Sequence, residues 1–313
     1  MECHVFTNPQ QGSTHKDLVA TAKTAEDCGL AGFFRSDHYR AVGDIAGLLP
    51  GSSDAWVTLG ALAGETRHIR LGTLVTAATF RYPGPLAITV AQVDQMSDGR
   101  VDFGFGAAWY EPEHRAYGIP YPDVGERFDR FEEQLAVITG LWETPEGETF
   151  SYQGKFYELI DSPALPKPVQ SPRPPIIIGG RGPQKTPRLA AQYADEFNFD
   201  FPALEVIPPQ TARLNAACEK IDRDPSTLRR SALLLLVCGR DDAEITRRCD
   251  AGANPSYLSY MLEHGLVGSP GQVVDRIGKF AEAGLTRIYL QTPQQYDVDH
   301  WEFFADQVLP QLT

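Results

Sequence analysis

The stretch PIIIGGRGPQKTPRLAAQYADEF, residues 175–197, contains the unit from which the fold is predicted. Its β-branched run at 176–178 predicts a short buried strand, and the glycine cluster at 179–182 ends that strand. Apolar residues then recur at helical spacing until the next apolar run, DEFNF (195–199), predicts another strand. A strand, a helix and a second strand in succession form the βαβ unit of a parallel sheet.

The same unit recurs from end to end of the 313-residue chain. Helical segments such as DAWVTLGALAGET (54–66) and PLAITVAQVDQMSDG (85–99) separate the strand-like runs. The predicted strands cover residues 2–7, 31–36, 68–76, 100–106, 175–180, 195–199, 231–239 and 285–291. Such a repeat predicts an α/β protein with a (β/α)8 TIM barrel and a single domain over 1–313. An open, doubly wound sheet is the alternative.

The stretch Thr149–Pro175 breaks this pattern, because it is rich in Tyr, Phe and Pro. We expect a strand-like insertion here, at about 149–175, over one mouth of the barrel and near its C-terminal face. Active sites of TIM barrels lie at that face, where the strands end.

Composition and charge exclude several classes of function. The formal net charge of −13 argues against a nucleic-acid partner, and no Lys/Arg run suggests an anionic membrane surface. The N-terminus lacks the pattern of a signal peptide, and no apolar stretch approaches the roughly 18 residues of a membrane span. We therefore expect a cytoplasmic protein. The five cysteines form no C-x-x-C pair and are expected to stay reduced.

Two glycine motifs come close to nucleotide-binding signatures without matching them. In GGRGPQKT, from Gly179, Gln184 replaces the second glycine of the phosphate loop G-x-x-x-x-G-K-[ST]. In GFGAAW, from Gly104, Trp109 replaces the last glycine of G-x-G-x-x-G. We therefore expect neither nucleotide hydrolysis nor NAD binding of the Rossmann type. Each motif still places glycines directly after a predicted strand, at the active face of a barrel.

The first of these loops has the chemistry of an anion site. Gly179, Gly180 and Gly182 allow backbone amides to approach an anion, and the following helix directs its positive end toward the loop. Arg181 and Lys185 add positive charge. The residues alone predict either a phosphate-binding loop or a tight turn with two solvated cations.

The motif SDHYR places Asp37 and His38 just after the second predicted strand. A histidine there is a candidate proton donor or acceptor, whereas the alternative is a helix cap at Asp37 and a packed surface histidine. We expect no metal site, because the histidines show neither H-x-H nor H-E-x-x-H spacing. A barrel without metal ligands or an evident nucleophile favours a bound organic cofactor.

Three segments together resemble a known family: AEDCGLAGFFRSDHY (25–39), HIRLGTLVTAATFRYPGPLAITVAQVDQMSDGRVDFGFGAAWYEPEHRAYGIP (68–120) and PIIIGGRGPQKTPRLAAQYADEFN (175–198). They are similar to the bacterial luciferase-like monooxygenase superfamily, and within it to the actinobacterial oxidoreductases that use the deazaflavin F420. The resemblance covers nearly the whole chain and implies a (β/α)8 barrel with insertions.

The resemblance also implies where a cofactor ring lies. It places the ring over the barrel mouth against a bulge at Leu74, Val75 and Thr76, with a non-prolyl cis peptide expected at Leu74–Val75. Ala107 and Ala108 match the small residues that pass close to the cofactor.

Two further parts of the site follow from the same resemblance. Asp37 and His38 match an acidic residue and a histidine near the reactive edge of the ring. The loop Gly179–Gly182 matches the segment that holds the cofactor phosphate, so that Arg181 and Lys185 would face the phosphate and the acidic tail of F420.

The implied activity is hydride transfer between F420 and a small organic substrate, with His38 handling the accompanying proton. Trp109, Trp56 and Phe80 predict an apolar or aromatic substrate pocket, and a homodimer is expected. One alternative is an FMN-dependent monooxygenase on the same barrel. A second is a protein that binds F420 or a flavin without catalysis.

Overall fold

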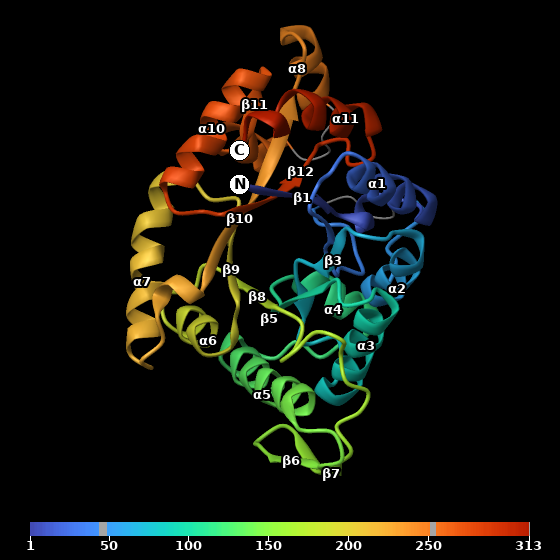
Figure 1. Ribbon diagram of the computed structural model, residues 1–313, viewed down its shortest axis with the longest axis vertical. Helices are drawn as coiled ribbons and strands as arrows, with labels where there is room; N and C mark the ends of the chain where they lie inside the picture. Colours follow the sequence, from blue (N-terminus) through green and yellow to red (C-terminus); the bar gives the residue numbers. More distant parts are fainter. Residues whose placement is uncertain (44–48, 251–254, 313) are drawn as a thin grey trace.

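The computed structural model of the protein describes residues 1–43, 49–250 and 255–312. Its centre is a closed ring of eight parallel strands, which follow one another around the ring in chain order (Figure 1). The ring consists of β1 (Glu2–Thr7), β2 (Gly32–Arg35), β3 (Arg70–Thr73), β5 (Val101–Gly106), β8 (Ile176–Gly179), β9 (Glu196–Asp200), β10 (Arg229–Cys238) and β12 (Arg287–Gln291). The predicted TIM barrel is therefore confirmed.

The closure of the ring decides against the open sheet. β9 pairs with β10 in parallel, with Glu196 opposite Arg229, and β12 pairs with both β10 and β1. No edge is left among these strands, whereas a doubly wound sheet has two. Short strands β4 (Thr76–Ala77) and β11 (Leu266–Gly268) extend the pairing of β5 and β10.

Helices surround this ring and are drawn outside it in Figure 1. They are α1 (His15–Asp27), α2 (Ala55–Glu65), α3 (Pro83–Met96), α4 (Glu111–Tyr117), α5 (Val124–Glu143), α6 (Lys185–Tyr193), α7 (Ile207–Glu219), α8 (Asp242–Cys249), α9 (Pro255–His264), α10 (Pro270–Glu282) and α11 (Val298–Gln307). Local sequence sets their starts: Thr14 and Asp17 form a capping box at α1, and Ser269 and Gln272 form another at α10. No helix among the described residues is long and apolar enough to cross a membrane.

The barrel interior is filled at its N-terminal end, which leaves space only at the other end. Arg287 on β12 lies 2.8 Å from Glu196 on β9 and 3.2 Å from Asp102 on β5, so buried charges join strands across the ring. The Tyr289 hydroxyl donates a hydrogen bond of 2.7 Å to Glu196. Apolar side chains pack along the inside of the barrel; these are Phe6, Phe34, Leu74, Ile177, Phe201, Leu233, Leu235, Val237, Met261 and Tyr289.

The predicted insertion contains an antiparallel hairpin, β6 (Phe150–Gln153) and β7 (Glu158–Ser162). In Figure 1 the hairpin lies beyond α5, outside the ring of strands. The Glu133 carboxylate on α5 accepts hydrogen bonds from the backbone N–H groups of residues 155–157, and Gln134 bonds the Tyr157 hydroxyl. These bonds hold the hairpin against α5, and its expected position near the C-terminal face stays a prediction.

Candidate active site

A cavity of about 1400 Å³ opens at the C-terminal ends of the barrel strands. Its wall divides into three sectors by strand order. Polar side chains come from the ends of β12, β1 and β2, small apolar residues follow β3 and β5, and the glycine loop and two arginines follow β8, β9 and β10. Parallel strands place all these segments at one mouth, which is why residues far apart in sequence share the cavity.

The small apolar sector has the predicted bulge. The Leu74–Val75 peptide is cis, as expected, and both residues line the cavity. Gly104 on β5 allows the chain before the bulge to pack closely against β5. A Cβ at this position would lie 1.9 Å from the Thr73 carbonyl oxygen. Ala107 and Ala108 continue the surface beyond β5. The result is a ledge of small side chains, the shape that a flat ring system requires.

The glycine loop lines the cavity, as predicted for Gly179, Gly180, Arg181 and Gly182. Gly180 has a φ of 138°, which a residue with a Cβ rarely adopts. The Arg181 guanidinium lies across the loop, 3.0 Å from the Asp200 carbonyl oxygen and 3.3 Å from its carboxylate. These bonds fix the position of the Arg181 guanidinium, and the Asp200 carboxylate neutralises its charge only in part.

Lys185 does not line the cavity, which corrects the expectation that it faces the phosphate. It is the first residue of α6, and its ammonium lies 2.7 Å from the Asp129 carboxylate on α5. The side chain turns outward because its ionic partner lies on the neighbouring helix. Arg181 is therefore the predicted cation of this loop that the structure brings to the cavity.

His38 lines the cavity and is held by a residue that the sequence analysis did not assign. Its Nδ1 lies 2.9 and 3.1 Å from the two carboxylate oxygens of Glu113, whose side chain is 1% exposed. The same carboxylate accepts the Tyr39 backbone N–H at 3.0 Å. An ionised carboxylate only accepts, so Nδ1 carries the proton and Nε2 is left to exchange protons with the cavity. Glu113 lies in the first turn of α4, the helix that follows the end of β5 at Gly106, and that placement was the available signal.

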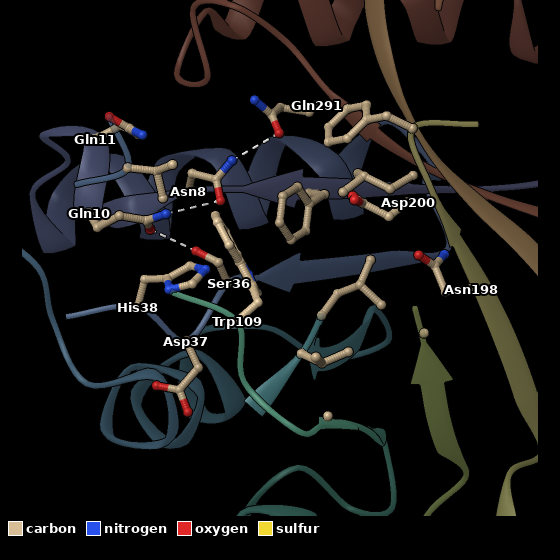
Figure 2. A pocket seen from close by; sticks show the side chains of 18 of the residues that line it. Asn8, Gln10, Gln11, Ser36, Asp37, His38, Trp109, Asn198, Asp200 and Gln291 are labelled. Atoms are coloured by element: carbon tan, nitrogen blue, oxygen red, sulfur yellow. Dashed lines mark hydrogen bonds between the residues drawn. The ribbon is translucent and has the colours of Figure 1, made fainter. Parts of the chain in front are cut away.

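Asp37 lies next to His38 in the sequence and has an ionic partner of its own. Its carboxylate is directed away from the His38 ring (Figure 2) and lies 2.5 Å from Arg81. Arg81 also binds Asp54 at 2.5 Å. Asp37 lines the cavity, and its ion pair with Arg81 anchors the loop after β2.

A row of carboxamides forms the polar sector, and the sequence analysis did not identify it. Ser36 donates to Gln10 at 2.7 Å, Gln10 to Asn8 at 3.2 Å, and Asn8 to Gln291 at 2.9 Å (Figure 2). The Asn8 backbone N–H also donates to Gln295. These residues follow β1, β2 and β12, so the strand-end rule that selected His38 also points to them. We call Asn8, Gln10, Ser36, Gln291 and Gln295 the carboxamide wall.

The predicted aromatic pocket is only partly present. Trp109 lines the cavity, with its ring 5.6 Å from that of His38 and nearly perpendicular to it. Trp56 and Phe80 do not line it. Trp56 is buried and its indole N–H donates to Thr76 Oγ1 at 3.0 Å, so both of these residues belong to the packing behind the ledge.

The outer position of Phe80 has a similar cause. Its ring packs against Tyr39 at 4.7 Å and His114 at 5.1 Å, outside the cavity wall.

In residues 1–43, 49–250 and 255–312, no group of three His, Cys, Asp or Glu side chains is arranged to hold a metal ion.

The amino-acid sequence is similar to that of enzymes with a shared cofactor. The F420-dependent glucose-6-phosphate dehydrogenase of Beutenbergia cavernae is 29% identical over 327 residues, covering 95% of this chain and 93% of the relative. The F420-dependent hydroxymycolic acid dehydrogenase of Mycobacterium tuberculosis is 30% identical over 321 residues, covering 94% and 84%. Both alignments span the barrel from end to end.

Solved structures and a family model agree with this. An F420-dependent secondary alcohol dehydrogenase in complex with an F420-acetone adduct superposes with a TM-score of 0.82 at 20% identity, covering 100% of this chain and 99% of the other. That likeness shows a common fold. The model of the luciferase-like monooxygenase family matches residues 1–264, which include the His38 loop, the ledge and the glycine loop. With a match over most of its length, the chain belongs to the luciferase-like monooxygenase family.

Proposed function

We propose that the protein is an F420-dependent oxidoreductase that acts on a small organic substrate. The two relatives named above are F420-dependent dehydrogenases by name, and each aligns over more than nine-tenths of this chain. When bound, the deazaflavin accepts or supplies a hydride, and the protein supplies position and proton transfer.

The residues present fit such a cofactor. The ledge of Leu74, Val75, Ala107 and Ala108 lines the cavity and would support the ring. Its shape depends on Gly104, because a Cβ there would collide with the Thr73 carbonyl oxygen. The loop Gly179–Gly182 offers backbone N–H groups, and an acidic tail would meet the guanidinium of Arg181. A cavity of about 1400 Å³ has room for a large cofactor and a substrate together.

The observation that carries the proposal is the His38–Glu113 pair beside the ledge. Glu113 holds Nδ1 at 2.9 Å and leaves Nε2 for the substrate. Oxidation of an alcohol releases a proton as well as a hydride, and reduction of a carbonyl takes one up. Nε2 of His38 would accept or return that proton.

The test is to identify the cofactor and then its reactivity. Purified protein is titrated separately with F420 and with FMN, and binding is followed by cofactor fluorescence. We expect tight binding of F420 and weaker binding of FMN. Preferred binding of FMN with oxygen consumption would instead support the monooxygenase alternative, whose basis is a 27% match over 214 residues to a flavin-dependent trigonelline monooxygenase.

A second measurement separates catalysis from binding alone. The F420-loaded protein is mixed with alcohols and with carbonyl compounds, and the redox state of F420 is followed by absorbance. Bound F420 that never changes its redox state would support the binding-protein alternative.

The homodimer and the cytoplasmic location stay predictions. Analytical ultracentrifugation tests the homodimer, and cell fractionation tests the location.

A further inference from the structure

We propose that the carboxamide wall selects a neutral, mainly apolar alcohol or carbonyl compound as the substrate, and that phosphorylated sugars are excluded. The inference rests on the proposed function, since it names the substrate class of the same cavity. It is carried by the hydrogen bonds of the wall, the charges around the cavity and the apolar surface opposite.

The hydrogen bonds of the wall leave some of its amide N–H groups unused. In the chain Ser36, Gln10, Asn8 and Gln291, each member donates to the next, so Gln10 and Asn8 each use one of two amide N–H groups. Gln291 is the last acceptor and donates to no partner among the described residues of the wall. A carboxamide carries two donors. The wall therefore presents neutral N–H groups that suit an uncharged oxygen atom.

The side chains of the wall are mostly buried and held in place. Gln10 is 2% exposed, Ser36 is 3% exposed and Gln295 is 8% exposed, so their orientations are set by packing and by one another. A ligand oxygen that accepts from the unused amide N–H groups would add hydrogen bonds to side chains that are already ordered. Ser36 and His38 lie two residues apart after β2, and Figure 2 draws His38 next to Ser36 and Gln10. An oxygen bound at that end of the wall would lie near the imidazole.

The charges around the cavity oppose an anionic substrate at the wall. Four carboxylates belong to lining residues and each is paired: Asp37 with Arg81, Glu113 with His38, Asp200 with Arg181, and Asp297 with Arg248. The described lining residues include two arginines, Arg181 and Arg247, and no lysine. Arg181 belongs to the glycine loop after β8, and Arg247 lies on α8 after β10. Each already has a carboxylate partner, Asp200 for Arg181 and Glu244 for Arg247. A phosphate at the wall would meet neutral carboxamide groups.

The remaining surface is apolar. Trp109 stands over His38 with 62% of its surface exposed, and Phe6, Phe201, Leu258 and Met261 line the cavity as well. Removing this surface from water is favourable at about 25 cal/mol per Å². A ligand with one polar end and an apolar body would satisfy the wall and cover these side chains.

The experiment compares neutral and phosphorylated probes on the F420-loaded protein. The probes are 2-propanol, cyclohexanol and 2-octanol on one side and glucose 6-phosphate on the other. We expect kcat/KM to be at least tenfold higher for cyclohexanol than for glucose 6-phosphate. Saturation-transfer NMR measures binding of each probe independently of turnover.

Two substitutions at one position test the wall itself. Gln291→Leu removes the carboxamide at the end of this hydrogen-bonded chain and should raise KM for cyclohexanol about tenfold, with the F420 dissociation constant unchanged. Gln291→Lys adds the missing cation and should shift preference toward glucose 6-phosphate by a similar factor. Gln192→Leu, the same change on the exposed surface of α6, serves as the control and should alter neither.

Several results would overturn the inference. They are equal or faster turnover of glucose 6-phosphate by the wild-type protein, no binding of any of the three alcohols to the loaded protein, and wild-type preference in both Gln291 variants. Each of these leaves F420 binding intact. Absence of F420 binding would instead overturn the proposed function, so the two failures are distinguishable.

Discussion

Replacing Glu113 with Gln should reverse the tautomer of His38. The Glu113 carboxylate accepts both the His38 Nδ1–H and the Tyr39 backbone N–H. A glutamine has one oxygen for these two donors. The Tyr39 amide cannot lose its proton, so the oxygen turns to Tyr39 and the new NH2 group faces Nδ1. Nδ1 must then accept, which moves the proton to Nε2.

The magnitude follows from the hydrogen bonds exchanged. A bond to a charged group contributes about 1.5–3 kcal/mol, which corresponds to a roughly 10- to 100-fold preference for Nδ1–H in the wild-type protein. In the variant a neutral bond of about 0.5–1.5 kcal/mol favours the opposite tautomer. With Nε2 protonated, His38 cannot accept a proton there. We therefore expect kcat for cyclohexanol oxidation to fall about 10- to 100-fold, less than the 10²–10⁴-fold loss expected for His38→Ala.

The assay is long-range 15N–1H correlation NMR at about pH 8, where free imidazoles are neutral. His38→Gln identifies the His38 signals among those of the seven histidines. Glu111→Gln is the matched control, because Glu111 lies on the same helix, α4, and pairs with Arg115 at the surface. The control should keep the wild-type tautomer, the wild-type kcat and the same affinity for F420.

One result would refute the reasoning directly. A wild-type His38 with its proton on Nε2 would mean that Glu113 does not orient the ring as the geometry indicates. An unchanged tautomer in Glu113→Gln, in a variant that still binds F420, would lead to the same conclusion.

Three further predictions concern the loop, the barrel and its buried histidine. Arg181→Ala should weaken F420 binding about tenfold or more in fluorescence titrations. Lys185→Ala should have little effect, because Lys185 faces α5. Equal losses of F420 affinity in the two variants would contradict this. Gly104→Ala should lower the free energy of unfolding in urea by at least about 1–3 kcal/mol, because its Cβ would collide with the Thr73 carbonyl, and an unchanged midpoint would count against the ledge geometry. Burial lowers the pKa of His4 to about 4 from 6.5, so the unfolded chain takes up that proton first on acidification. The free energy of unfolding should therefore fall as pH drops from about 6.5 to 4, by up to about 1.4 kcal/mol per pH unit, and His4→Phe should flatten that slope in denaturation experiments.

The order of the barrel could be predicted from the sequence because each of its strands repeats one local pattern. A short apolar run, a glycine or polar turn and an amphipathic helix are signals that neighbouring residues carry themselves. Parallel strands then bring every strand end to the same mouth. For that reason His38 and the loop Gly179–Gly182 could be assigned to one cavity before any contact was known, whereas the Leu74–Val75 bulge was expected from the family resemblance.

Tertiary structure decided which way side chains turn and which partner each one finds. Glu113 meets His38 across 75 positions of sequence, and Lys185 leaves the cavity for Asp129, 56 positions away. Trp56 faces the packing behind the ledge rather than the cavity. A helix or loop determines only where a Cα lies, whereas the direction of a side chain depends on the rotation of that helix and on the charges that distant segments bring within a few ångströms. The residues next to Glu113 or Lys185 in the sequence do not determine these distances. The two pairings therefore depend on how the closed barrel places distant segments.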